Sequence, residues 1–201
     1  MREVIPTPIP GLDLRREYGH HQSPAIRAGG MVFCSGMVAI DPQSGERQHG
    51  TVTSEARRIF ENLKLLLEPT GLSLDRLVQV HAMIYDRIEY DVLNRLYRQY
   101  VPNAPPARTV MIVQIEAGFR VTLDVIAAAE TRQPAAMIHP RQVIEPGGWR
   151  RPGLPHSPAI RAGDFVFLSG MTATDPTTGA PPVGSASDHE RPASTVLSCG
   201  A

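Results

Sequence analysis

The sequence predicts an α+β fold in which a mixed sheet carries two helices on one of its faces. Two segments place apolar residues at helical spacing, and short segments rich in β-branched residues lie before, between and after them. The expected order is two or three strands, helix, strand, helix, strand and strand, within about 130 residues. Helices that come between strands in this way suit a sheet that is covered on one side.

The first clear strand is the apolar run MVFCSG at residues 31–36. It is followed by DPQSG at residues 41–45, whose Asp, Pro, Ser and Gly favour a turn. A short apolar run that leads into a turn is typical of a buried strand.

Two amphipathic helices follow. The first is expected to begin at Thr53, which can act as the N-cap, and to end at Pro69 and Gly71. Its apolar stripe consists of Ile59, Phe60, Leu63, Leu66 and Leu67. The second is expected at residues 89–100. Its stripe consists of Leu93, Leu96, Tyr97 and Tyr100.

Three further strands are expected at residues 77–84, 107–115 and 120–129, where β-branched residues are frequent. The segment at 107–115 is apolar on both alternating faces, with Met111 on one face and Ile112 on the other. Two helices cannot cover both faces of the sheet. The second face therefore needs a partner subunit.

Composition narrows the class of partner. The 201 residues include 20 basic and 20 acidic side chains, so the chain lacks the basic surface expected of a nucleic-acid or anionic-membrane binder. Small polar molecules are the expected ligands. Neither a signal peptide nor a run approaching about 18 apolar residues is found, so a cytoplasmic protein is expected. Cys34 and Cys199 are expected to be reduced thiols, and no metal or cofactor is predicted.

One stretch occurs twice, as SPAIRAGGMVFCSGM at residues 23–37 and as SPAIRAGDFVFLSGM at residues 157–171. The match continues directly into VAIDPQSG and TATDPTTG. This repeat distance is that of whole domains, because solenoid repeats span only about 20–50 residues.

We therefore expect a complete domain at residues 1–132 and a partial second copy at 133–201. The second copy lacks both helices and the last three strands, and residues 184–201 have the composition of a disordered tail. Truncation by a frameshift or an early stop is one interpretation. The other is a hairpin that packs against a neighbouring first domain and supplies a missing strand.

Five blocks in order, covering roughly residues 20–130, resemble the Rid (YjgF/RidA) family of reactive imine and enamine deaminases. They are SPAIRAGGMVFCSGMVAIDPQSG, ENLKLLLEPTGLSLDRLVQVHAMIYD, LNRLYRQY, PPARTVMIV and VTLDVIAAA. The resemblance implies a chorismate-mutase-like α+β fold, a homotrimer, and active sites in the clefts between subunits. It also implies hydrolysis of 2-imino or 2-enamino acids to 2-oxo acids and ammonia.

The resemblance also implies site residues. Arg108 matches the arginine of the family's PAR motif, which clamps the substrate carboxylate, as a planar guanidinium can do with two parallel donors. Asn94 matches a position that lines the cleft, and a backbone carbonyl near Val110 can place water. Gly36 and Gln22 fall at substrate-binding positions of the first block. The alternative for Arg108 is one of many solvated surface arginines.

The chain departs from the family where an acidic residue normally holds the attacking water, because Thr122 stands there. Asp124 lies on the same strand face and could reach a water through a shifted geometry; otherwise it is a solvated or cross-strand-paired carboxylate. Two functions thus stay open. One is a deaminase with Arg108 and Asp124 as catalytic residues and Thr122 in the pocket. The other is a module that binds small 2-oxo acids without turnover.

Overall fold

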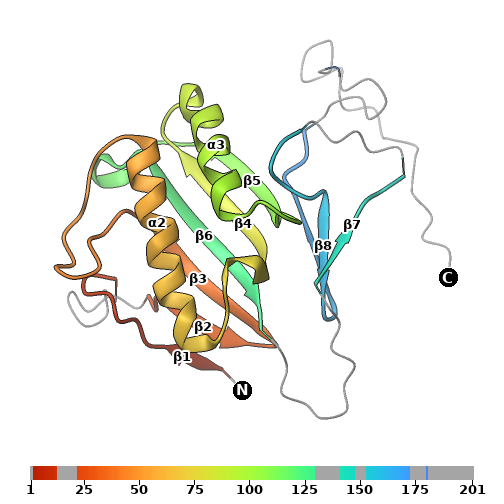
Figure 1. Ribbon diagram of the computed structural model, residues 1–201, viewed down its shortest axis with the longest axis horizontal. Coiled ribbons are helices and arrows are strands. Elements are labelled where there is room, and N and C mark those ends of the chain that lie inside the picture. Colours follow the sequence, from red (N-terminus) through yellow and green to blue (C-terminus); the bar gives the residue numbers. More distant parts are fainter. Residues whose placement is uncertain (1, 13–21, 130–140, 148–152, 173–179, 181–201) are drawn as a thin grey trace.

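A mixed six-stranded sheet with two helices on one face forms the larger part of the computed structural model (Figure 1). The structure describes residues 2–12, 22–129, 141–147, 153–172 and 180. Across the sheet the strands are β1 (Glu3–Ile5), β2 (Ala25–Ala28), β3 (Met31–Met37), β6 (Val121–Ala128), β4 (Leu77–Ile84) and β5 (Ala107–Ile112). The β4–β5 pair is parallel and the other pairs are antiparallel. The predicted α+β class is confirmed.

The first helix, α2 (Val52–Leu67), begins one residue before Thr53, the predicted N-cap. Its N-cap is Thr51, because Thr51 and Ser54 form a reciprocal capping box. The Ser54 amide donates to Thr51 Oγ1 at 3.2 Å, and the Thr51 amide donates to Ser54 Oγ at 2.9 Å. A short 3₁₀ helix, η1 (Glu68–Thr70), follows, and Gly71 ends the segment with φ +74°.

The second helix, α3 (Tyr90–Tyr100), follows the 3₁₀ turn η3 (Arg87–Glu89) and packs beside α2 over the sheet (Figure 1). The Phe60 ring of α2 stacks on Tyr100 at 4.5 Å and meets the Tyr97 ring edge-on at 5.6 Å. Aromatic pairs of this kind add to the gain from buried area. The predicted apolar stripes therefore form the core under the two helices.

The strand β5 is shorter than the predicted range 107–115 because its neighbour limits it. β4 ends at Ile84, and the Val113 amide makes one further hydrogen bond to the Ile84 carbonyl at 3.0 Å. Beyond that bond β5 has no partner strand, and the chain turns through the 3₁₀ segment η4 (Glu116–Gly118). Another short 3₁₀ turn, η2 (Leu74–Arg76), precedes β4.

The second copy forms a three-stranded sheet of its own, with strands β7 (Gln142–Ile144), β8 (Ala159–Ala162) and β9 (Phe165–Leu168). We call residues 23–37 the first hairpin and residues 157–171 the second hairpin. Their strands pair in the same register, and β7 pairs with β8 as β1 pairs with β2. The repeat is therefore one of structure as well as of sequence.

The second sheet packs against one end of the first sheet. Ile160 and Ala162 of β8 are buried together with Val78 and Ala107 in an apolar cluster separate from the core under the helices. The second hairpin thus covers the start of β5, without adding a strand to the first sheet. Farther along β5, Ile112 stays 54% exposed. The expected homotrimer and the domain boundary at residue 132 stay predictions.

The expected disordered tail at residues 184–201 lies outside the described residues. Within the described ranges, no helix has both the length and the apolar character needed to cross a membrane.

One buried carboxylate joins α2 to the sheet. Glu55 is 1% exposed, and its Oε1 accepts from the Gly50 amide at 3.0 Å. Its Oε2 accepts from the amides of Arg120 and Val121 at 2.8 and 3.3 Å, just where β6 begins. Backbone amides that donate to an ionised carboxylate form stronger hydrogen bonds than neutral pairs do.

We expect Glu55→Ala to lower the free energy of unfolding by about 3 kcal/mol, because buried amides lose their acceptor. Glu55→Gln keeps an acceptor but loses the charge, so about half of that loss is expected. Urea unfolding followed by circular dichroism measures both values. A Glu55→Ala protein as stable as wild type would show that the three hydrogen bonds contribute nothing.

Candidate active site

Arg108 lies at the second position of the edge strand β5 and is only 3% exposed. The second hairpin contacts its backbone on both sides. The Arg108 amide donates to Ser169 Oγ at 2.8 Å, and the Gly170 amide donates to the Arg108 carbonyl at 3.1 Å. The backbone amide and carbonyl of Arg108 at the outer edge of the sheet are therefore bonded to the second copy instead of to solvent.

The guanidinium of Arg108 extends to α3. Its Nη2 donates to Asn94 Oδ1 at 2.7 Å, and its Cζ lies 4.7 Å from the centre of the Tyr97 ring and 6.0 Å from that of Tyr90. The other donors, Nε and Nη1, are buried without a hydrogen-bond partner, and so is Asn94 Nδ2. The sequence analysis predicted Arg108 and Asn94 as site residues, and the structure brings the two side chains together.

The charge of this guanidinium is not balanced by the protein. Burial lowers the pKa of Arg108, yet an arginine remains a cation at physiological pH. Burial also raises the pKa of Tyr97, so its phenol stays neutral and cannot serve as the counter-charge. Among the described residues no carboxylate forms an ion pair with Arg108. The unpaired donors of a buried cation suit an anionic ligand such as a carboxylate.

The loop before β8 forms one wall beside Arg108. Ser157 donates through its amide to the Pro106 carbonyl at 3.1 Å and through its hydroxyl to the Pro105 carbonyl at 2.5 Å. Next to it, the pKa of His156 is lowered, first by burial and then by the positive charge of Arg108. An imidazole held in its neutral form can accept a hydrogen bond.

Within one chain, the structure does not bring Asp124 to Arg108. Asp124 Oδ1 lies 2.8 Å from His81 Nδ1, directly across β6 and β4. Arg108 is the register partner of Val80, and adjacent residues of a strand point to opposite faces. Arg108 and Asp124 therefore project from opposite faces of the sheet.

The remaining predicted positions lie elsewhere. Thr122 Oγ1 donates to the Met37 carbonyl at 2.9 Å, beside Gly36 on β3. Gln22 is exposed just before β2. Gly36 on β3 and Arg108 are separated by β6 and β4. Val110 lies two residues beyond Arg108 on the same strand, so its carbonyl also faces the edge of the sheet.

Sequence reasoning missed several residues that contact or flank Arg108. Tyr97 was expected only as part of an apolar stripe, and Ser169, Gly170 and His156 were not considered. The sequence repeat could have identified Gly170 and His156. Gly170 and His156 occupy in the second copy the positions that Gly36 and Gln22 occupy in the first.

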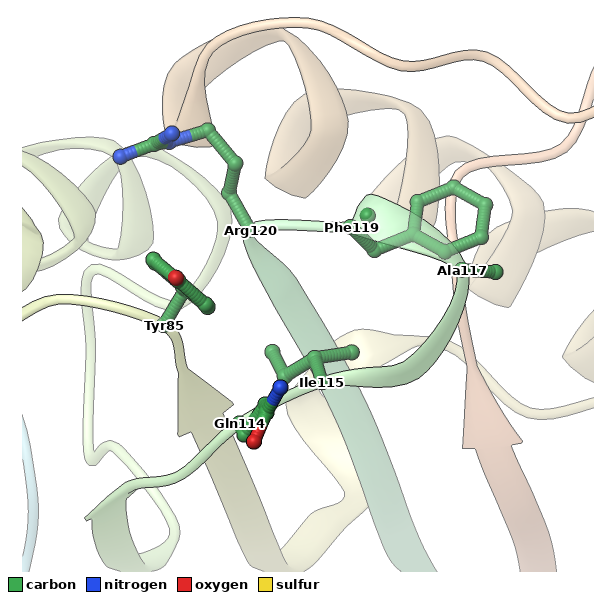
Figure 2. A pocket seen from close by; sticks show the side chains of 7 residues that line it. Tyr85, Gln114, Ile115, Ala117, Phe119 and Arg120 are labelled. Carbon is green, nitrogen blue, oxygen red and sulfur yellow. The ribbon is translucent and has the colours of Figure 1, made fainter.

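A hollow of about 750 Å³ lies at the far end of β5 and is a weaker candidate. Figure 2 shows Arg120 and Tyr85 on one side of it and Phe119 on the other. The Arg120 guanidinium is already paired with Glu89. Unlike Arg108, it is therefore already paired with a carboxylate.

A metal centre has no support within the described ranges, because no group of three or more His, Cys, Asp or Glu side chains is placed to hold an ion.

Known proteins match the part of the chain that contains the first copy. The family model described as Endoribonuclease L-PSP matches residues 16–129, more than half of the chain. "Protein DfrA" of Myxococcus xanthus is 34% identical over 111 residues, which are 55% of this chain and 85% of that protein. A Mus musculus protein named 2-iminobutanoate/2-iminopropanoate deaminase is 28% identical over 106 residues, 52% of this chain and 78% of that protein.

Solved structures resemble the same part of the molecule. A putative endoribonuclease from Thermotoga maritima superposes with a TM-score of 0.58 at 30% identity and covers 65% of this chain and 99% of its own. RidA from an Antarctic Psychrobacter superposes with a TM-score of 0.56 at 26% identity, covering 63% of this chain and 98% of its own.

The lowered pKa of His156 makes stability depend on pH. The unfolded chain binds a proton to this imidazole more readily than the folded chain does, so the free energy of unfolding falls as pH drops from about 7 to about 5. Urea unfolding across this range is expected to give a smaller fall for His156→Gln than for wild type. Parallel curves for the two proteins would contradict the assignment.

Proposed function

The chain belongs to the endoribonuclease L-PSP family, the Rid family, and on this premise we propose that it hydrolyses reactive 2-imino acids to 2-oxo acids and ammonia. One observation carries the proposal. Arg108 is buried and charged, and two of its guanidinium donors, Nε and Nη1, have no hydrogen-bond partner among the described residues. The carboxylate of a 2-imino acid accepts hydrogen bonds from the guanidinium and balances its charge.

The substrate carboxylate accepts from Nε or Nη1 of Arg108 together with the second N–H of Nη2, while Asn94 Oδ1 accepts from the first N–H of Nη2 and the Tyr97 ring supports the guanidinium plane. This arrangement leaves the cation with one orientation. Fixing one end of a small substrate places its imine carbon at a defined point, which removes much of the entropic barrier to attack.

Hydrolysis then needs one water and a path for protons. The oxygen of water bonds to the imine carbon, and one of its protons passes to the imine nitrogen, giving a carbinolamine. The C–N bond breaks as the hydroxyl proton is transferred to nitrogen, so a 2-oxo acid and ammonia leave. We assign placement of the water to the Val110 carbonyl, which faces the same edge of the sheet as the Arg108 backbone.

An alternative assignment makes Asp124 the base and places Thr122 in the lining of the pocket. Both belong to this site only if a second chain brings its own β6 to Arg108, because within one chain Asp124 projects from the other face and is paired with His81. We therefore assign Asp124 a role in the reaction only in an assembly of chains.

A binding module without turnover is the second candidate function. It is favoured by the absence of a carboxylate beside Arg108 among the described residues and by Thr122 in place of an acidic residue. Such a module binds a carboxylate through Arg108 but has no base to activate the attacking water. The family description also names ribonuclease activity, but equal numbers of acidic and basic residues provide no net positive charge to attract RNA.

We expect Arg108→Ala to lower kcat/KM for freshly generated 2-iminopropanoate by roughly 30-fold to several thousand-fold, because truncating one partner of a buried charge pair costs about 2–5 kcal/mol. Arg108→Lys recovers only part of the loss, since an ammonium cannot reproduce the planar fork. Ammonia release measures the rate.

Arg95→Ala is the matched control, because Arg95 lies on α3 beside Asn94, is exposed, and carries the same charge. It is expected to keep the wild-type rate. Equal rates for Arg108→Ala and Arg95→Ala would exclude the clamp. Arg108-dependent binding of 2-oxobutanoate by a wild-type protein that releases no ammonia would establish the binding module instead.

A further inference from the structure

The second hairpin reproduces the local structure of the first hairpin at the level of single hydrogen bonds. Ser35 Oγ donates to the Ser23 carbonyl at 2.6 Å, and Ser169 Oγ donates to the Ser157 carbonyl at the same distance. The backbone amides of Ser35 and Ser169 also correspond, because each donates to a proline carbonyl at 2.9 Å. The two hairpins therefore present the same set of polar groups.

The second hairpin uses these groups to dock at Arg108. Ser169 Oγ, besides its local bond, accepts from the Arg108 amide, and the Gly170 amide donates to the Arg108 carbonyl. Ser157 binds the two proline carbonyls just before Arg108. On the neighbouring strand, Gln79 Nε2 donates to the Leu168 carbonyl at 3.2 Å.

The first hairpin cannot make this contact within its own chain. Two strands, β6 and β4, lie between β3 and β5, which puts Gly36 on the order of 14 Å from β5 at about 4.8 Å per strand. Gln22 is on the same side of the sheet as Gly36. Their repeat equivalents, His156 and Gly170, lie against Arg108 instead.

We propose that the second copy acts as a built-in neighbouring subunit: the second hairpin and the loop before it supply, within one chain, the half of the Arg108 site that the first hairpin cannot reach. The inference rests on the proposed function for the identity of the ligand, a small 2-oxo or 2-imino acid. The docking itself rests on the hydrogen bonds around Ser157, Ser169 and Gly170.

The second copy depends on this docking for its own structure. Phe165 and Leu168 of β9 are 53% and 58% exposed, whereas their first-copy equivalents, Met31 and Cys34, are 4% and 7% exposed. A sheet of three short strands that leaves such residues in water is not stable alone. Burial of Ile160 against the first sheet supplies its main apolar contact.

Because the two hairpins are equivalent, a first hairpin from another chain fits the surface that the second hairpin occupies. Only one of them can contact Arg108 at a time. The second copy thus competes with head-to-tail association, in which each first hairpin docks on the next chain and closes a ring.

The repeat offers a matched pair of variants in the full chain. Ser169→Ala and Ser35→Ala lose the same local hydrogen bond, but only Ser169 also accepts from the Arg108 amide. By calorimetry with 2-oxobutanoate, Ser169→Ala is expected to weaken binding about 3- to 10-fold, and Ser35→Ala less than about twofold.

A steric variant tests the docking more strongly. A Cβ at Gly170 would lie 2.9 Å from Thr109 Cγ2, so Gly170→Ala is expected to loosen the second hairpin. Hydrogen exchange of the peptide around Arg108 reports the loosening without any ligand. Thr109→Ala removes the clashing methyl group, so the double variant should regain both amide protection and affinity.

The possible results separate the two proposals. Wild-type affinity in Gly170→Ala, despite faster exchange around Arg108, would overturn the inference while leaving the clamp intact. A wild-type protein that neither binds nor deaminates these acids would overturn the proposed function, and with it the ligand half of the inference. Hydrogen exchange around Arg108 that is as slow in Gly170→Ala as in wild type would show that the hairpin docks elsewhere.

Discussion

The buried guanidinium of Arg108 is the constraint on which the site depends. A cation with two unpaired donors in a water-excluded place is unfavourable, and proteins keep such groups where a ligand completes them. Asn94 and Tyr97 hold the group from α3, and the second hairpin bonds to the backbone of the same residue. The proposed anion site is therefore organised before a ligand arrives, which would lower the cost of binding.

The two copies explain why the candidate site residues divide between two places. Gly36 on β3 lies beside Thr122 on β6, and Arg108 and Asn94 lie together at β5, with β4 between β6 and β5. A half-site of this kind becomes whole only when a second hairpin meets β5. We propose that the second hairpin of this chain takes that place.

Sequence patterns predicted the elements well and their contacts poorly, for a physical reason. The frequency of β-branched residues located β4 at both ends, because consecutive residues of this strand are buried on both faces of the sheet. The start of α2 was misplaced because Thr51 and Thr53 are both acceptable caps, and only the pairing of Thr51 with Ser54 decides. The docking of Ser169 on Arg108 joins residues 61 apart, which no local pattern encodes.

Folding of the second copy and ligand binding at Arg108 are linked. The second copy leaves Phe165 and Leu168 in water, so its order depends on contacts with β5 and β4, among them the bonds to the Arg108 backbone and to the Gln79 side chain. A ligand that binds only the docked state stabilises that state, and by reciprocity every contact that favours docking raises the affinity for the ligand. The hydroxyl of Ser169 touches the backbone of Arg108 and not its guanidinium, yet it acts on affinity through this linkage.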